Sequence, residues 1–257
     1  MKKTFTLLFS IAFFTFVQAQ SFEIGGRYLA TSNWFFNSNV TNSGGSESVT
    51  AQNYSAVYSS TYGLHLAYNF NEHTGLEANL LMATLSQSYN GNFPTDKGGY
   101  LPDNGMVYYA SETFKSEVTV NALQIPIFFR FLSGNGAYVE LGPEVDIITD
   151  ANYSATYKGG PSTSFSSDVG QYYANDMICG VLSFGNNIRI SHSFFFNINL
   201  RFSYDFTDMK GVDALGQNMK DDALYSGSNP FYSKYQTTNA VSASFGVGLL
   251  YRFGHDF

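Results

Sequence analysis

The five arginines of this 257-residue chain all fall at positions that alternate with apolar residues, and six acids share that pattern. The residues concerned are Arg27, Arg130, Arg189, Arg201 and Arg252, with Glu23, Glu77, Glu140, Glu144, Asp146 and Asp205. A planar guanidinium can pair with a carboxylate through two hydrogen bonds. Five such cations among six anions therefore predict a network of ion pairs, provided that the chain brings them to one place.

The segments around these charges alternate strictly between apolar and polar residues. Along residues 121–131 and 137–147 the odd positions are almost all apolar, whereas the even positions carry Gln, Arg, Glu and Asp. A period of two over this length predicts β-strands with one apolar face. Between them, residues 132–136 read Leu-Ser-Gly-Asn-Gly, which is the composition of a hairpin turn.

Eight alternating runs of this kind follow one another along the chain. We predict strands at residues 22–31, 57–70, 75–89, 121–131, 137–147, 175–190, 194–206 and 241–253. Short polar turns alternate with long segments rich in Ser, Asn, Gly and Thr, which we predict to be loops at residues 37–56, 90–113, 150–174 and 207–238. Each run is long enough for the ~9–11 residues of a tilted membrane-crossing strand. Turns on one side and long loops on the other are typical of outer-membrane barrels. The predicted fold is all-β: an eight-stranded antiparallel up-and-down transmembrane β-barrel.

Composition supports this class. Aromatic residues make up 18% of the chain and charged residues only 13%, about half the charged share of an average soluble domain. The aromatic residues gather at both ends of the predicted strands, and Trp34, Phe35 and Phe36 are assigned to the girdle beside the long loops. The net charge of −7 argues against a nucleic-acid partner. The single cysteine, Cys179, excludes a disulfide framework within the chain.

The chain begins like an exported protein. Basic residues at positions 2 and 3 precede an apolar run at 5–17, and Val17 and Ala19 are small residues at the positions that precede a cleavage point. We predict a signal peptide at residues 1–19, removed after Ala19, and an outer-membrane β-barrel domain at residues 20–257. An even number of strands would then place both termini on the periplasmic side.

The charged face of the strands would line the barrel interior. Eight strands leave an interior that side chains just fill, so the preferred interpretation of the charges is a packed polar plug. The alternative is a narrow path for ions or small solutes.

No catalytic, cofactor-binding or metal-binding residues are expected. A Ser/His/acid site of the kind found in lipid-modifying barrels needs a histidine at the outer rim, and the pattern places none there. His65 falls on the interior face, where it could pair with Glu77, and His192 lies in a Ser-His-Ser turn. Asp213, Asp221 and Asp222 could bind a divalent cation weakly, although a solvated loop is the simpler interpretation. We therefore predict that the protein is not an enzyme.

The run Ala122-Leu-Gln-Ile-Pro-Ile-Phe-Phe-Arg130 and the pair Gly142-Pro143 resemble the pattern of the small outer-membrane β-barrel proteins of Bacteroidetes, a group that includes the PorT-like barrels. The architecture also resembles the eight-stranded OmpA and OmpX barrels. The resemblance covers the whole predicted mature chain. It implies an outer-membrane location and allows a role as an accessory barrel of a protein secretion system, but a shared fold does not define an activity.

The loops are rich in Tyr, Asn, Ser and Gly, a composition shared by binding surfaces and by ordinary solvated loops. The expected role is structural, or one of interaction at the cell surface. The expected partners are outer-membrane lipid, the barrel assembly machinery through the terminal Phe257, and an extracellular or secretion-system protein.

Overall fold

The computed structural model describes residues 21–37, 51–55, 57–92, 99–100, 107–108, 113–158, 164–170, 173–210 and 237–254. Its strands are β1 (Ser21–Asn37), β2 (Ala51–Ser55), β3 (Tyr58–Asn69), β4 (Thr74–Asn92), β5 (Gly99–Tyr100), β6 (Val107–Tyr108), β7 (Thr113–Leu132), β8 (Ala137–Lys158), β9 (Ser164–Asp168), β10 (Asp176–Arg189), β11 (Phe194–Asp205) and β12 (Thr238–Gly254). Within these ranges, no helix is long and apolar enough to cross a membrane.

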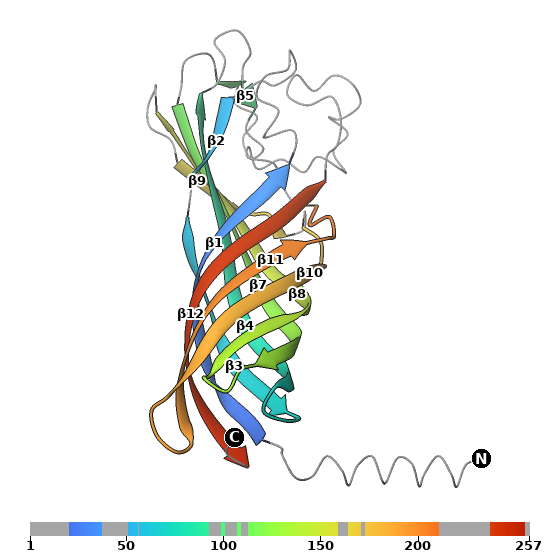
Figure 1. Cartoon of the computed structure of the whole chain (residues 1–257). Helices are drawn as coiled ribbons and strands as arrows, with labels where there is room; N and C mark the ends of the chain where they lie inside the picture. Colours follow the sequence, from blue (N-terminus) through green and yellow to red (C-terminus); the bar gives the residue numbers. More distant parts are fainter. Residues whose placement is uncertain are drawn as a thin grey trace, which may run out of the picture.

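Eight of the strands close into one antiparallel ring (Figure 1). Their order around the ring is β1-β3-β4-β7-β8-β10-β11-β12, and β12 returns to β1 along a seam that runs from Ser21↔Gly254 to Asn37↔Thr238. The predicted eight-stranded up-and-down barrel is thereby confirmed. Closure matters because lipid offers no hydrogen-bonding partner to the backbone of an open edge.

Three short turns and both described ends of the chain lie at the same end of the barrel (Figure 1). In the turn from β3 to β4, the Asn71 side-chain oxygen accepts hydrogen bonds from the backbone N–H groups of His73 and Thr74, at 2.8 and 2.9 Å. In the turn from β7 to β8, Gly136 has a φ of +87°, and a Cβ there would lie 2.5 Å from the Asn187 carbonyl oxygen. Local side-chain hydrogen bonds and a glycine with positive φ are what tight turns require.

At the opposite end, several strands are longer than the sequence predicted. β4, β7 and β8 continue past their neighbours, and β2 and β9 pair with them to give the order β2-β4-β7-β8-β9. We call this extension the projecting sheet; it comprises β2, β9 and residues 84–92, 113–121 and 148–158. The predicted loops at residues 37–56, 90–113 and 150–174 therefore each contain strand residues. They were missed because Ser, Thr, Asn and Gln are frequent in them, so that the apolar alternation is lost.

A β-bulge marks the passage from the barrel to the projecting sheet. Asn121 pairs with Asp150 and Ala122 with Ile148, which leaves Thr149 as an extra residue on β8. The buried positions of β8 consequently change from even to odd numbers, with Tyr153 buried above the bulge. One inserted residue reverses the faces of a strand, so parity counted from the hairpin fails beyond residue 148.

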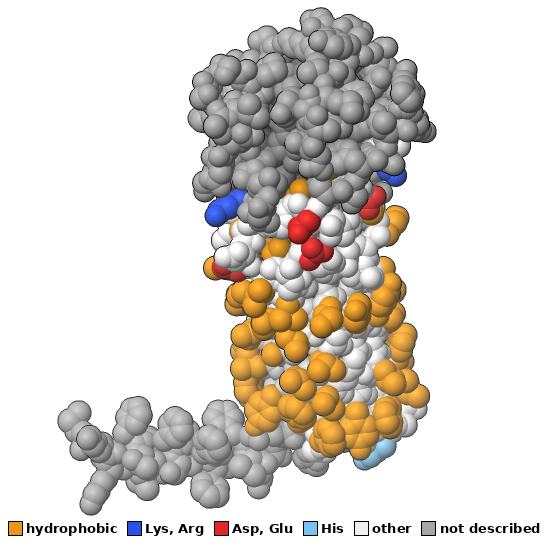
Figure 2. All heavy atoms as spheres, turned by 180° about the vertical axis from the view of Figure 1, so that it is seen from behind, with side chains coloured by type: hydrophobic (Ala, Val, Ile, Leu, Met, Phe, Trp, Pro, Cys, Tyr) orange, Lys and Arg blue, Asp and Glu red, His pale blue; other side chains and the backbone are white. Residues whose placement is uncertain are grey.

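The outer surface of the barrel is apolar and its interior polar, the reverse of a soluble protein. Leu64, Leu141 and Phe245 are 56%, 58% and 53% exposed. On the face drawn in Figure 2, such side chains form a band across the barrel, and the acidic side chains visible on that face lie toward the loop end. A continuous apolar band of this kind is suited to lipid, and the ring strands cross it.

Aromatic residues border the band at both ends. Next to the short turns, Phe129 and Phe131 stack edge to face with ring centroids 4.9 Å apart, and Tyr68–Phe70 and Tyr251–Phe253 do the same at 5.5 and 4.5 Å. At the far end the Tyr204 and Phe206 rings pair with their centroids 5.3 Å apart.

The assignment of Phe35 to the aromatic girdle beside the long loops is wrong. Its side chain is only 2% exposed, because strand β1 continues in strict alternation through it and turns it inward.

Gly142 allows a close approach of β7 and β8 that a side chain would prevent. A Cβ at this position would overlap the Ile127 carbonyl oxygen and lie 3.0 Å from the Phe128 Cα. We expect Gly142→Ala to lower the free energy of unfolding by about 1–3 kcal/mol, because the two backbones must separate. Gly26→Ala is the matched control: a Cβ there would meet nothing nearer than the Gly63 carbonyl oxygen at 3.8 Å. Urea titration in lipid vesicles measures both, and equal losses would contradict the close-approach explanation.

Candidate functional site

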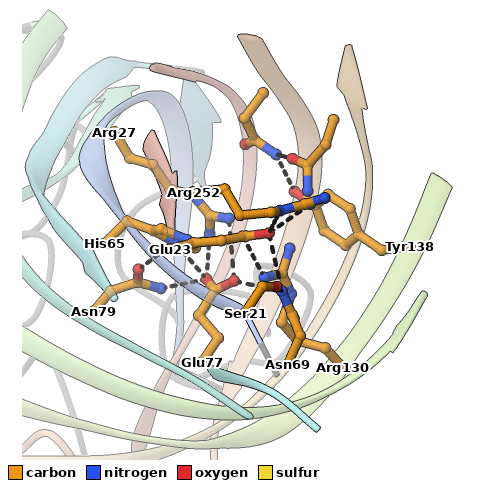
Figure 3. A network of polar contacts seen from close by, with 12 residues as sticks. Ser21, Glu23, Arg27, His65, Asn69, Glu77, Asn79, Arg130, Tyr138 and Arg252 are labelled. Atoms are coloured by element: carbon orange, nitrogen blue, oxygen red, sulfur yellow. Dashed lines mark hydrogen bonds and ion pairs between the residues drawn. The ribbon is translucent and has the colours of Figure 1, made fainter. Parts of the chain in front are cut away.

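The most distinctive feature of the described chain is a set of buried charged side chains inside the barrel (Figure 3). Those nearer the short turns form what we call the lower charge layer: Glu23, Arg27, His65, Glu77, Arg130, Glu140 and Arg252. Those nearer the projecting sheet form the upper acid group: Glu144, Asp146, Asp205 and Cys179, with Arg201 beside Glu144.

Arg130 lies at the centre of the lower charge layer and is 0% exposed. Its Nη1 donates a hydrogen bond of 2.8 Å to Glu23, while its Nε lies 2.9 Å from the Glu140 carboxylate and 3.3 Å from that of Glu77. The Arg130–Glu140 pair follows from the β7–β8 register, in which the two residues are direct partners. The best-aligned bond, however, goes across the lumen to Glu23 on β1, a strand that is not a neighbour of β7.

Arg27 and Glu77 form a second, two-pronged pair. Arg27 Nη1 and Nη2 donate to the two oxygens of Glu77 at 2.5 and 3.2 Å. Both side chains are buried, and Arg27 Nη2 also lies 3.9 Å from Glu140. Parallel hydrogen bonds between a guanidinium and a carboxylate fix the orientation of both groups, so this pair ties β1 to β4 through the interior.

Glu23 connects the network to the barrel seam. It accepts hydrogen bonds from Arg252 Nη2 and Nε at 2.6 and 2.9 Å, and from the Asn69 side-chain amide at 3.0 Å. Arg252 lies on β12, the last strand, with its guanidinium 4.1 Å from the centre of the Phe195 ring. The ion pair and the cation–π contact together hold Arg252 against the inner wall.

His65 is fully buried within the same layer. Its Nδ1 lies 3.3 Å from Glu77 and 3.2 Å from the Asn79 side-chain oxygen, and its Nε2 lies 3.6 Å from Glu23. The expected contact with Glu77 is therefore present. These partners are two carboxylates and an amide, an arrangement that holds the ring in place.

The lower charge layer is formally balanced, because three glutamates face three arginines. Charges in a low-dielectric interior are tolerated when each is paired and hydrogen-bonded, and removal of one partner is costly. Such a layer can hold the strands in one register and block the lumen.

Above this layer, further polar side chains contact one another inside the barrel. Arg201 contacts Glu144, and the Gln124 amide donates a hydrogen bond of 2.8 Å to Asp146. The cavity bordered by Gln124, Arg201 and Thr31 measures only about 10 Å³, roughly the space of one water molecule. The described side chains at this height therefore leave little free space around Gln124 and Arg201.

One of the five arginines is not part of the buried set. Arg189 is exposed at the short-turn rim, where it donates a hydrogen bond of 3.4 Å to the His192 carbonyl and lies over the Phe195 ring at 5.6 Å. It lines a hollow of about 420 Å³ at this mouth, together with Arg252 and residues of two turns. It lies on the lumen-facing side of β10, as predicted from its parity, but it is the last residue of that strand, so its side chain is exposed at the mouth of the barrel.

Several interior polar residues were not singled out from the sequence. Asn197 donates hydrogen bonds of 2.7 Å to the Tyr138 hydroxyl and to the Asn187 side chain, and Gln124 joins two acids. Their positions share the parity of the charges, which was the available signal. Asp213, Asp221, Asp222, His255, Phe257 and the predicted signal peptide at residues 1–19 lie outside the described residues.

Comparison with known proteins finds similar structures but no similar sequences. No family model matches the chain. No curated protein matches it in sequence either. Among solved structures, it is similar to the attachment invasion locus protein Ail of Yersinia pestis (TM-score 0.38, 8% identity, 92% of this chain and 100% of that one). It is also similar to Neisserial surface protein A (TM-score 0.38, 9% identity, 90% of this chain and 97% of that one). A third similar structure is the outer membrane protein OprG of Pseudomonas aeruginosa (TM-score 0.38, 14% identity, 93% of this chain and 98% of that one). At these values the likeness carries no residue-level information, and the closed ring of paired strands is what defines the fold of this chain.

Proposed function

We propose that this protein is a closed, non-enzymatic barrel of the bacterial outer membrane that holds the projecting sheet and its loops at the cell surface for interaction with an extracellular partner. The observation that carries the proposal is the division of the molecule along its axis. A charge-filled lumen lies within the apolar band, and a sheet of five strands rises beyond it.

The closed lumen supports an anchor in preference to a pore. Arg130, Arg27 and their carboxylate partners reach across the interior from strands that are not neighbours. A conducting path would need water around these groups, whereas Arg130, Glu77 and Glu140 are all 1% exposed or less. Passage of a solute would require several buried ion pairs to separate together.

The direction of the barrel follows from the rule for outer-membrane barrels, which have short turns inside and long loops outside. By that rule the described ends, Ser21 and Gly254, lie on the periplasmic side and the projecting sheet lies outside the cell.

Thiol labelling on intact cells tests this orientation. Cys179 is buried and is the only cysteine, so Cys179→Ala gives a background to which one exposed cysteine is added. Ser154→Cys on the projecting sheet should react with a membrane-impermeant maleimide, and Ser133→Cys in the β7–β8 turn should react only after the outer membrane is opened. The reverse result would overturn the orientation.

Planar bilayer recording separates the anchor from the channel. The purified barrel should insert without unit conductance, and a reproducible ion-selective step in its current trace would show that the lumen is a pore.

A photo-crosslinker attached at Ser154→Cys or at Ser133→Cys tests on which side of the membrane a partner protein binds. Capture from Ser154→Cys alone supports a surface role, whereas capture from Ser133→Cys alone would indicate a periplasmic secretion assembly of the PorT-like kind.

Export requires the predicted signal peptide. We expect the mature protein to begin at Gln20, because the small residues Val17 and Ala19 precede the cleavage point. Intact mass and N-terminal sequencing of protein taken from the outer membrane measure this directly. Ala19→Arg should cause the precursor to accumulate, while Gln18→Ala is a control that leaves both small residues in place. A mature chain that retains Met1 would show that the prediction is wrong.

A further inference from the structure

The upper acid group contains more negative than positive charge. Glu144, Asp146 and Asp205 are 1%, 2% and 0% exposed, and Arg201, in contact with Glu144, is the buried arginine beside them. The lower charge layer, by contrast, has three acids and three arginines. Buried carboxylates without a countercharge are costly, so two acids of the upper group require another form of compensation.

The same place brings a thiol next to these acids. Cys179 on β10 is the direct partner of Glu144 on β8 and of Asp205 on β11. The ligand atoms of Glu144, Asp146 and Cys179 all lie within 4.8 Å of one another, and Cys179 Sγ is 3.9 Å from Asp146 Oδ2. Donors around a tetrahedral zinc ion are about 3.5 Å apart, given bonds of 2.0–2.3 Å. Small movements of the side chains would therefore close the site.

One potential metal ligand, the Asp146 carboxylate, uses only one of its two oxygens in hydrogen bonds among the described residues. Asp146 Oδ2 accepts a hydrogen bond from Gln124 at 2.8 Å, whereas Asp146 Oδ1 has no hydrogen-bond partner among the described residues. A buried carboxylate oxygen without a hydrogen-bond partner calls for a proton, a water molecule or an ion beside it. Gln124 holds the carboxylate from one side, as the outer shell of a metal site does, and leaves the other oxygen available as a ligand.

We propose that Glu144, Asp146 and Cys179 form a binding site for a thiophilic divalent cation of the zinc class, with Asp205, the β11 partner of Cys179, adding negative charge nearby. One thiolate with carboxylates favours Zn²⁺ over Mg²⁺ or Ca²⁺, which prefer oxygen ligands only. The thiol loses its proton to solvent when the cation binds. The sequence predicted no metal site here because the donors come from separate strands and match no short motif.

Cobalt is the probe, since Co²⁺ takes zinc sites and gives a visible thiolate-to-metal absorption. The refolded wild-type barrel should take up one Co²⁺ per chain with this absorption, and added Zn²⁺ should displace it while Mg²⁺ should not. Cys179→Ala should abolish the absorption, and Asp146→Asn should weaken uptake by at least the roughly 10–100-fold that losing a residue around the ligands of a metal costs. Ser183→Ala removes a buried hydroxyl from the same face of β10 and should change neither value.

Heat-modifiable migration on a gel shows for each variant whether the barrel is folded. If Asp146→Asn does not fold, Cys179→Ala, which loses only a sulfur, still decides the question. Wild-type protein without a thiolate absorption, or equal cobalt uptake by the wild type and Cys179→Ala, would overturn the site and would show that the excess acids are compensated by protons.

Discussion

Replacing Arg130 with methionine should strongly destabilise the barrel. The substitution keeps a long side chain but removes the cation that lies within 3.3 Å of three carboxylates, those of Glu23, Glu77 and Glu140. Loss of one partner from a buried ion pair costs about 3–5 kcal/mol, because the remaining charge is desolvated and uncompensated. The expected result is a corresponding loss in the free energy of unfolding in lipid vesicles, measured by urea titration.

The double variant Arg130→Met with Glu140→Gln is the informative comparison. It restores the charge balance of the lower layer, and Glu140 is the partner whose two carboxylate oxygens both have no aligned hydrogen bond among the described residues. We expect the double variant to be more stable than Arg130→Met alone. A double variant whose loss equals or exceeds the sum of the two single losses would contradict the coupling. In a wet lumen every effect would shrink to the ~0–1 kcal/mol of exposed pairs.

Arginine at Leu200 should cost about 2–4 kcal/mol. Leu200 is 50% exposed in the middle of β11, within the apolar band, between Phe184 and Phe245 on its two neighbours. A cationic side chain on the lipid face of a barrel has this cost near the membrane midplane and almost none near the interfaces. Urea titration in vesicles again supplies the measurement.

Two controls make the Leu200 result specific to position. Ser154→Arg introduces the same side chain on the projecting sheet, at an exposed site beyond the apolar band, and should change stability by less than about 0.5 kcal/mol. Ser203→Asn adds bulk to the inner wall of the same strand without adding charge. Equal costs for Leu200→Arg and Ser154→Arg would mean that the apolar band does not face lipid.

The period of two was enough to define the ring, because lipid and lumen demand opposite side chains at successive positions. Arg130 and Glu140 could be paired from the sequence alone, since a tight turn fixes the register of their hairpin. The same rule did not apply to the projecting sheet. In the part of β7 that precedes the predicted strand, for example, the buried face carries Ser116, so that face does not have to be apolar and the periodicity disappears.

Contacts across the lumen lay beyond sequence reasoning for a geometric reason. Arg130 and Glu23 belong to strands that are not neighbours and are 107 residues apart, so their meeting depends on the diameter and stagger of the closed ring. No metal site was predicted at Cys179 for the same reason, because its acidic neighbours come from β8 and β11. Phe35 was misplaced because a cluster of three aromatic residues was read as a group instead of by its alternation.

The ion pair at the seam has a consequence for how the barrel is assembled. Glu23 and Arg252 are 229 residues apart in the chain, yet they lie on paired strands at the point where the ring closes. Until β12 docks, Glu23 lacks one of its two arginines, the edges of β1 and β11 have unpaired backbone groups, and water can reach the acids through the gap. In lipid each of these defects is costly, and the docking of one strand removes all of them together. The docking of β12 therefore completes the seam, the ion pair and the closed lumen in one step, and a chain that ended before β12 would remain an open, wet sheet.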